Sequence, residues 1–273
     1  NTVCVYDGNN TSIDTNDINE AKSSVTAENA LTFVVVGDYI TSETNWVVKD
    51  DAKSIVLTDA EPFYCPSDVT VENMTYKRDY VYDVWQALYV PFSSKCSDWG
   101  SDTKIAYLNN IHQYDTDDNG TIDKVTIEFF SLSGSADVKA NIPYLIKPEI
   151  AENKTYTFSN VTMKATPAED GSVSCASTTW DYKISGNYQP ISSLTSDNYV
   201  LIKGGGFGNM TSGSLPPFRI RLKTSPMEYG TRTGEGLDKN VIIQLVVDGV
   251  PVSLDAVSPE AMENIFLDLQ GRR

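Results

Sequence analysis

Histidine is almost absent from this chain of 273 residues, and its single occurrence is His112. One histidine excludes a zinc site built on two histidines and the H-E-x-x-H helix of metalloproteases. Any serine or cysteine nucleophile that needs a histidine base would have to use His112. The alternating segment around it favours an ordinary half-buried position in a strand. Carboxylate-pair chemistry stays open because Asp and Glu are plentiful, but no pair stands out.

Long apolar runs and cysteine clusters are missing as well. No apolar stretch approaches the roughly 20 residues of a membrane-spanning helix, so we expect no membrane insertion of this segment. The four cysteines, Cys4, Cys65, Cys96 and Cys175, show neither a C-x-x-C motif nor a zinc spacing. A chain of this length does not need disulfides for stability. We therefore expect several of them to be small apolar core residues, and their pairing stays open.

Basic residues are few: 21 Lys and Arg stand against 37 Asp and Glu, for a net charge of −16. A protein this acidic repels phosphate backbones, which argues against a nucleic-acid partner. The excess is uneven, because residues 1–75 hold 13 acidic groups and three basic ones. The imbalance indicates an acidic surface and suggests that the chain has two parts.

Apolar and polar residues alternate along most of the chain, with frequent Gly, Pro, Asn and Asp breaks. This pattern predicts an all-β protein, built as an antiparallel β-sandwich with a smaller N-terminal β segment. The predicted strands cover residues 3–6, 31–36, 46–49, 54–57, 70–77, 85–91, 104–114, 124–132, 142–146, 154–158, 161–165, 179–189, 199–203, 218–224 and 241–247. Helix signals are confined to residues 14–22 and 258–263.

Composition also suggests where the parts of the chain begin and end. Residues 1–67 alternate short apolar strands with acidic linkers, which predicts a small β segment of stacked rungs or a small sheet. A Pro-bracketed passage at 61–66 suggests its end, and the sandwich then covers residues 68–236. Residues 237–273 are predicted to hold one strand and the start of a C-terminal sorting or anchor segment. The Gly-rich stretch 204–208 precedes no helix, so we predict a turn rather than a phosphate cradle.

An acidic loop at residues 115–123 is the sharpest motif. Oxygen-bearing side chains occupy positions one, three, five and nine of a calcium-loop pattern, with Gly at position six. These candidate ligands are Asp115, Asp117, Asn119 and Asp123. The twelfth position, where such loops carry Glu, is Thr126, and both flanks alternate like strands rather than helices. Asn-Gly also suits a plain hairpin connection, which the sequence favours, with Ca²⁺ as the alternative and no other cofactor predicted.

Aromatic residues make up 10% of the chain. Exposed Trp and Tyr rings can stack on sugars, which makes Trp99, Trp180 and Tyr182 the candidate ligand-binding residues, with Trp46 as a further candidate. Trp85 is excluded because it alternates inward with its neighbours. Tyrosine is equally a common filler of sheets with a polar tip, so a core position is the competing interpretation for each ring.

Several short motifs follow one another between residues 76 and 222. They are Tyr76–Asp79 leading into Val84–Phe92 (W-x-x-L-x-x-P-F), then Ile111–Asp115, Asn141–Lys147 (P-Y-L-I-K), Trp180–Tyr188 (G-x-Y) and Leu215–Leu222 (P-F-R). In this order they resemble the β-rich region that follows the repeats of BspA-like leucine-rich-repeat surface proteins of gut and oral anaerobes. Asn264–Arg273 resembles the opening of a C-terminal segment found in exported proteins of the same bacteria.

The resemblance implies an extracellular or cell-surface location on a bacterium and a non-catalytic role in structural display or in binding host protein or glycan. The repeat L-x-x-L-x-L-x-x-N itself does not occur, so the ligand binding credited to the repeats is absent from this chain. Two alternatives remain, namely a carbohydrate-binding module with structural calcium and a carboxylate-pair hydrolase. The sequence does not predict a specific ligand or an oligomeric state.

Overall fold

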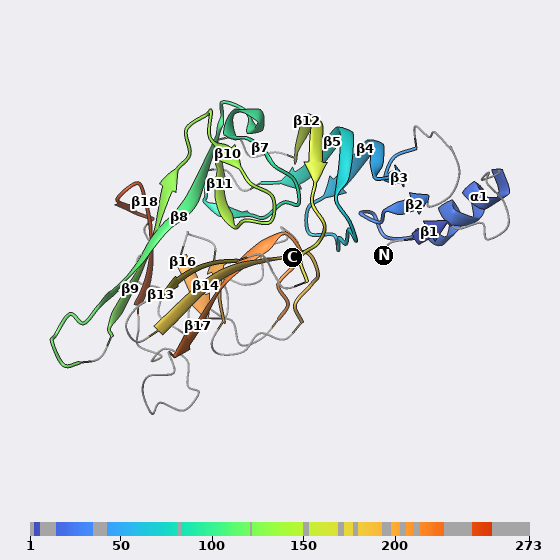
Figure 1. Ribbon diagram of the computed structural model, residues 1–273. Coiled ribbons are helices and arrows are strands. Elements are labelled where there is room, and N and C mark those ends of the chain that lie inside the picture. The colour runs from blue at the N-terminus through green and yellow to red at the C-terminus, as the bar shows by residue number, and fades with distance from the viewer. Residues whose placement is uncertain are drawn as a thin grey trace.

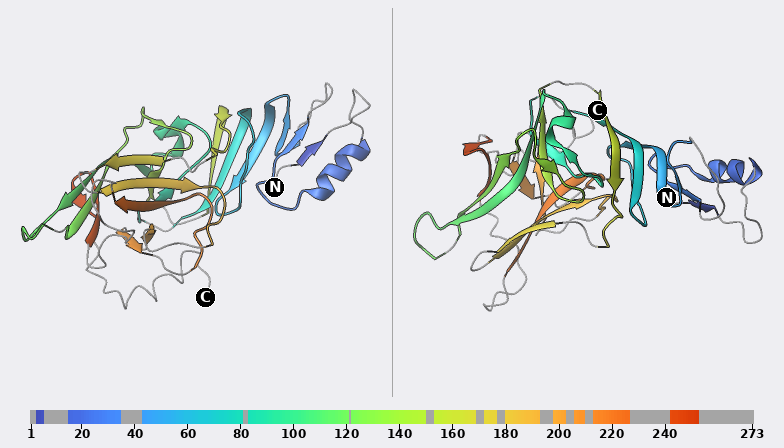
Figure 2. Two further views of the ribbon diagram at one scale, coloured as in Figure 1. Left: turned by 60° about the horizontal axis from the view of Figure 1, so that its bottom comes forward. Right: turned by 45° about the horizontal axis from the view of Figure 1, so that its top comes forward.

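The computed structural model describes residues 3–5, 15–34, 43–80, 83–120, 122–149, 153–168, 172–176, 180–192, 198–202, 206–209, 213–226 and 242–252. Within these residues the secondary structure consists of strands β1 to β19, one α-helix and one 3-10 helix. The all-β prediction is confirmed. The strands form three large sheets and one small ribbon (Figure 1; Figure 2).

The first sheet has the order β1-β2-β3-β4-β5-β12. Its elements are β1 (Val3–Val5), β2 (Thr32–Val34), β3 (Trp46–Val48), β4 (Asp51–Thr58), β5 (Val69–Asp79) and β12 (Asn153–Met163), with α1 (Thr15–Ser24) between β1 and β2. Strands β1, β2 and β3 are parallel neighbours, and so are β4 and β5. The sheet is therefore mixed rather than purely antiparallel, because crossovers rather than hairpins connect most of its short strands.

Local turns explain where the strands of this sheet begin. Lys49 and Asp50 both have positive φ, at 50° and 68°, which is the geometry of a tight two-residue hairpin between β3 and β4.

The helix predicted at 14–22 is present as α1. Strand β12 is continuous, whereas the sequence predicts two strands at 154–158 and 161–165. Residue 67 falls between β4 and β5, which are hydrogen-bonded neighbours in this one sheet.

The second sheet has the order β19-β18-β9-β8-β11-β6. Its strands are β6 (Gln86–Leu88), β8 (Thr103–Tyr114), β9 (Lys124–Ser131), β11 (Tyr144–Pro148), β18 (Ile242–Val247) and β19 (Val250–Pro251). The long β8–β9 hairpin projects from the body (Figure 1). An irregularity between Leu108 and Asn110 shifts its register and so changes which side chains face inward. Beyond it, Gln113 donates a hydrogen bond to the Tyr182 hydroxyl of the third sheet.

The third sheet is antiparallel, with the order β13-β14-β17-β15-β16. Its strands are β13 (Ser172–Ala176), β14 (Trp180–Asn187), β15 (Asn198–Ile202), β16 (Gly206–Asn209) and β17 (Arg219–Pro226). The turn predicted at 204–208 is wrong for residues 206–208, because they belong to β16, where Phe207 pairs with Leu201. A ribbon of β7 (Ser94–Lys95) and β10 (Asp137–Val138), with the 3-10 helix η1 (Cys96–Trp99), completes the described structure.

One hydrophobic core joins the three sheets. It contains fully buried side chains of the first sheet (Met74), the second sheet (Ile127) and the third sheet (Leu222). Cys65 and Cys96 are free thiols in this core, which confirms the core prediction for these two cysteines. The side chains of Cys4 and Cys175, the helix predicted at 258–263 and the C-terminal segment 253–273 lie outside the described residues.

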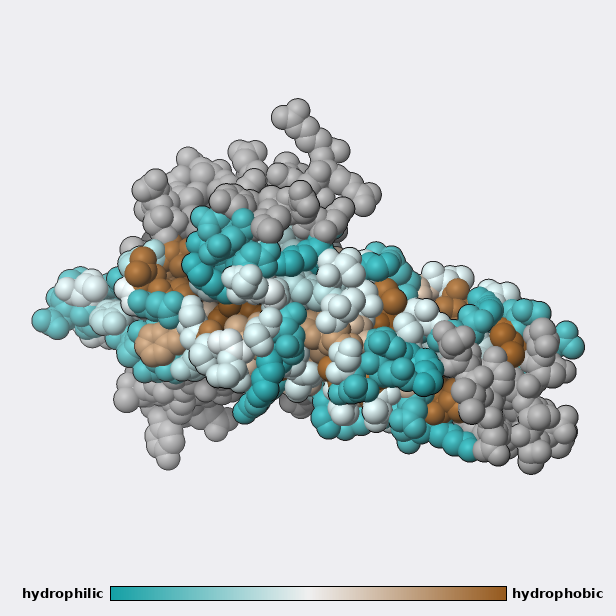
Figure 3. All heavy atoms as spheres, turned by 90° about the horizontal axis from the view of Figure 1, so that it is seen from above, coloured by the Kyte–Doolittle hydropathy of each residue, from teal (hydrophilic) through white to brown (hydrophobic). Residues whose placement is uncertain are grey.

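The described surface mixes polar and apolar residues. On the face seen in Figure 3, hydrophobic residues are scattered among hydrophilic ones over the whole length of the molecule. Within the described residues, no helix combines the length and the apolar character that crossing a membrane requires.

Candidate functional site

The most distinctive residues of the sequence motifs meet at a buried carboxylate between the sheets, Asp59. Both oxygens of Asp59, just after β4, accept hydrogen bonds of 2.7 Å from Arg219 of β17. The Tyr76 hydroxyl of β5 donates to the same carboxylate at 2.8 Å. Arg78 places its Nε 3.6 Å from Asp59 and donates from its guanidinium to the carbonyl of Ala87 in β6 at 2.6 Å. Residues of all three sheets are thus tied together here.

The electrostatics of this centre are those of a permanent ion pair. Burial alone would raise the pKa of Asp59, but the charges of Arg219 and Arg78 outweigh it, so the pKa lies below its ordinary value. Burial also raises the pKa of the Tyr76 phenol, which keeps its proton to donate. The side chains of Asp59 and Arg78 are only 8% and 2% exposed. A carboxylate enclosed in this way holds sheets together rather than reaching a substrate.

An aromatic cluster completes the same junction. The ring centroid of Tyr188, which follows β14, lies 4.5 Å from that of Tyr89 and 5.3 Å from that of Phe218. The Tyr188 hydroxyl donates to Asn141 Oδ1 at 2.7 Å. A Cβ atom added at Gly186 would lie 2.1 Å from the Tyr89 ring, so only glycine fits there. The motifs that sequence analysis singled out therefore meet in space, which the sequence by itself did not reveal.

Two of the rings predicted to bind a ligand are buried. Trp99 is fully buried because η1 turns it inward, where it packs against Tyr156 at 4.8 Å and donates its Nε1–H to Ser94. Tyr182 is 1% exposed. The expectation of exposed rings is therefore wrong for both residues, and Trp46 is buried as well. The backbone of Trp180 begins β14, and its side chain lies outside the described part of the chain.

The acidic loop connects β8 to β9 at the far end of the long hairpin. Carboxylate oxygens of Asp115, Asp117 and Asp123 lie within 4.8 Å of one another, as the spacing of the motif predicts. Asn119 instead donates its side-chain amide to Asp117 at 2.8 Å. Gly120 adopts φ 85°, which turns the chain so that its backbone N–H donates to Asp115 at 2.7 Å.

Internal hydrogen bonds keep this loop in shape. The hydroxyl and backbone N–H of Thr116 both donate to Asp123, and these bonds lower the pKa of that carboxyl. Three carboxylates at one point could supply part of a calcium shell of six to eight oxygens. The flanking strands confirm that the loop closes a hairpin. Calcium binding stays a prediction.

His112 lies on β8 with a side chain that is 42% exposed. Its Nε2 is 3.7 Å from Glu128, which also accepts a 2.8 Å hydrogen bond from Asn109. Within the described residues, His112 forms no hydrogen bond with a serine or cysteine. The half-exposed strand position agrees with the ordinary role that its sequence context favours.

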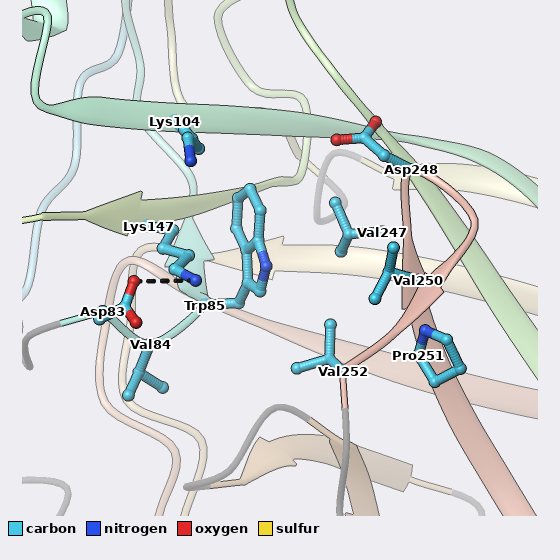
Figure 4. A pocket seen from close by; sticks show the side chains of 10 residues that line it. All are labelled: Asp83, Val84, Trp85, Lys104, Lys147, Val247, Asp248, Val250, Pro251 and Val252. Carbon is cyan, nitrogen blue, oxygen red and sulfur yellow. Dashed lines mark ion pairs between the residues drawn. The ribbon is translucent and has the colours of Figure 1, made fainter.

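A cavity of about 340 Å³ opens beside Trp85, and sequence analysis missed it. Figure 4 shows Val247, Val250 and Val252 on one side of the indole, and Lys104 and Lys147 on the other. The lining residues are Asp83, Val84, Trp85, Lys104, Lys147, Val247, Asp248, Val250, Pro251 and Val252. They come from distant parts of the chain, so no local pattern points to this cavity. Trp85 is 8% exposed, which agrees with its predicted inward orientation.

A scan against protein-family models gives no match for this chain. Searches of curated proteins and of solved structures give none either.

Proposed function

We propose that this chain is a non-catalytic, extracellular module of a bacterial surface protein, which holds and presents neighbouring segments for adhesion to host protein or glycan. The observation that carries this proposal is the junction around Asp59. Motif residues such as Arg78, Gly186, Tyr188 and Arg219 lock three sheets together there. Residues in such a position make a rigid body rather than a reactive site.

The N-terminal half of the first sheet supports a position of this module next to an array of repeats. Strands β1, β2 and β3 are three residues long and parallel, like the rungs of a repeat array. Strand β1 lies at the end of the described sheet, and the outer side of a parallel edge strand is where a further parallel strand pairs. A module of this form can join an array of parallel repeats to a compact body.

The body has the physical properties that a spacer needs. All three large sheets contribute to one core, and a buried ion pair links the first sheet to the third. Force applied at one end is therefore carried through packed side chains rather than through a flexible linker. A carbohydrate-binding platform needs exposed aromatic rings, and the rings of Trp99 and Tyr182 are buried. We therefore do not propose this alternative.

The test compares cells that display the parent protein with and without the whole module, residues 1–273. Surface display is measured by antibody binding to a tag placed ahead of the repeats, and adhesion by binding to immobilised host protein and glycan. We expect the deletion to reduce both. A full-length Lys53→Gln variant, altered at an exposed ion pair with Glu72, is the control and should behave as wild type. Unchanged display and adhesion in the deletion would contradict the proposal.

A further inference from the structure

The outer face of the long β8–β9 hairpin carries several aromatic rings. Cross-strand pairing places Tyr107 opposite Phe130 near the body and Tyr114 opposite Lys124 near the tip, with His112 in between. Opposed residues of paired strands point to the same side of a sheet, so these side chains form one surface. Tyr107 and Tyr114 are 36% and 44% exposed, which makes them two of the four exposed large hydrophobic side chains in the described residues. The hairpin projects from the body and its other side faces the third sheet, so this surface is open to a partner (Figure 1).

A carboxylate lies in the middle of this outer face. Glu128 of β9 is two positions from Phe130, is opposite Asn110, and has a side chain that is 22% exposed. Its Oε2 accepts the 2.8 Å hydrogen bond from Asn109 and lies 3.7 Å from His112 Nε2. Among the residues that the structure describes, none donates to its Oε1, and no Lys or Arg forms an ion pair with it. A carboxylate with rings on both sides along the strand favours a cation that can also lie against those rings.

Negative charge is left without compensation along the hairpin. Residues 107–130 hold five acidic groups and one basic group, a net charge of −4. The one lysine, Lys124, lies over the Tyr114 ring, with its Nζ 5.8 Å from the ring centroid. Asp68 and Asp102, elsewhere in the protein, are each paired with a lysine at 2.6 Å. Within the described part of the chain, the loop carboxylates have no such Lys or Arg partner; these are Asp115, Asp117, Asp118 and Asp123. The hairpin therefore attracts a positively charged partner.

We propose that the outer face of the β8–β9 hairpin binds an extended, basic segment of a partner protein. A guanidinium can lie against a tyrosine ring while it donates to a carboxylate, and a neutral sugar would leave the charge unused. One cation pairs with Glu128 between the rings, and a second reaches the loop at Asp123. These two residues are five positions apart, or about 17 Å at the rise of a strand, so two cations about five positions apart in an extended segment match them. The inference rests on the proposed function, because it names the chemistry of the host protein surface that the module contacts.

Calorimetric titration of the full chain tests the proposal, with chelator present so that no metal offsets the charge of the loop. The probe is a peptide of serine and threonine with two arginines five positions apart. The comparison probes are the same peptide with glutamine at both positions and cellohexaose, a neutral glycan. We expect saturable binding of the arginine peptide with a Kd of about 1 mM or tighter. The glutamine peptide should bind at least about tenfold more weakly, and added salt should weaken binding of the arginine peptide, because the attraction is electrostatic.

Two variants of the hairpin separate the contribution of the charge from that of the rings. Glu128→Gln removes the central charge and keeps a hydrogen-bond acceptor, and it should weaken binding of the arginine peptide at least about threefold. Combined Tyr107→Thr and Tyr114→Thr removes two rings and keeps residues that suit a strand, and it should also weaken binding at least about threefold. Melting temperatures show that both variants fold. The matched controls are Glu72→Gln and Tyr64→Thr, at exposed positions outside the hairpin, and they should bind as wild type.

Some results would overturn the assignment. They are a failure of the arginine peptide to saturate at about 10 mM, equal binding of the arginine and glutamine peptides, tighter binding of cellohexaose than of the arginine peptide, and unchanged affinity in both hairpin variants. Peptide binding is measured on the isolated chain, whereas display and adhesion are measured on cells with and without the whole module. A failure of this inference is therefore distinguishable from a failure of the proposed function.

Discussion

Asp59 and Arg219 are 160 positions apart in the chain, yet they meet through two hydrogen bonds of 2.7 Å each. Asp59 follows the last residue of β4, and Arg219 is the first residue of β17, so the pair joins the first sheet to the third. Their side chains are 8% and 16% exposed. The planar guanidinium matches the carboxylate in a two-pronged contact, which is the strongest form of such a pair.

Breaking this pair should destabilise the protein strongly. We expect Arg219→Met to lower the free energy of unfolding by about 3 kcal/mol, because it removes one of the two arginines that compensate a buried charge. Arg219→Lys keeps the charge but loses the two-pronged contact with the carboxylate. It should therefore lower the free energy of unfolding by about 1–2 kcal/mol. Urea unfolding measures both. Lys53→Gln, at an exposed ion pair, should cost at most about 1 kcal/mol. A loss for Arg219→Met no larger than for this control would show that the pair contributes little.

The Asp59 charge also predicts how stability depends on pH. Its pKa in the folded protein is depressed below that of the unfolded chain, which is about 3.9. The stabilisation is therefore complete above the unfolded pKa and is lost as the pH falls through the folded pKa. We expect the free energy of unfolding to decline below about pH 4, and to decline less in Asp59→Asn. Parallel pH profiles for the two proteins would contradict this. Other paired carboxyls add to the decline equally in both.

Gly186 should tolerate no side chain. We expect Gly186→Ala to lower the free energy of unfolding by about 3 kcal/mol, because its Cβ would lie 2.1 Å from the Tyr89 ring. Combining it with Tyr89→Leu should cost less than the sum of the single changes, since the smaller side chain relieves the clash. A Cβ atom added at Gly120 would meet no atom within 4 Å, but the residue has φ 85°. Gly120→Ala therefore measures the cost of the backbone conformation alone, and we expect it to lower the free energy of unfolding by about 1 kcal/mol. Additive losses at Gly186 and Tyr89 would count against the clash.

The acidic loop predicts a weak response to calcium. Without the Glu of the twelfth position, we expect a Kd of about 1 mM, in the range of extracellular modules. At about 10 mM, Ca²⁺ should then stabilise the protein by about 1.4 kcal/mol relative to chelator. Combined Asp115→Asn and Asp123→Asn should abolish the difference in melting temperature, while Asp137→Asn, on the β7–β10 ribbon, should keep it. If chelator does not change the melting temperature of the unmodified protein, the loop is a plain hairpin connection that binds no calcium.

Alternation of side chains was enough to locate most strands. Strands β8 and β9 begin and end within one residue of the predicted segments, because alternation over so many residues is a local signal. The Gly-rich β16 was missed since glycine carries no such signal, and pairing with β15 makes it a strand. The mixed order of the first sheet was also missed, because single-strand periodicity does not specify the neighbour.

The candidate sites also divide into those that local sequence determines and those that depend on long-range contacts. Asp115, Asp117 and Asp123 come together as predicted, because they belong to one short loop. Trp99 was misplaced, since its burial depends on the turn of η1 toward Tyr156. The cavity beside Trp85 combines residues from both ends of the second sheet and could not be found from local patterns.

By itself, the amino-acid sequence determined the class of the fold, most strand positions and the shape of the acidic loop, because each depends on neighbours within a few residues. Only the tertiary structure decided that Asp59 would meet Arg219, that Gly186 would lie against Tyr89 and that a cavity would open beside Trp85. Such contacts depend on which strands pair and in what register, and these choices follow from burying apolar surface across the whole chain.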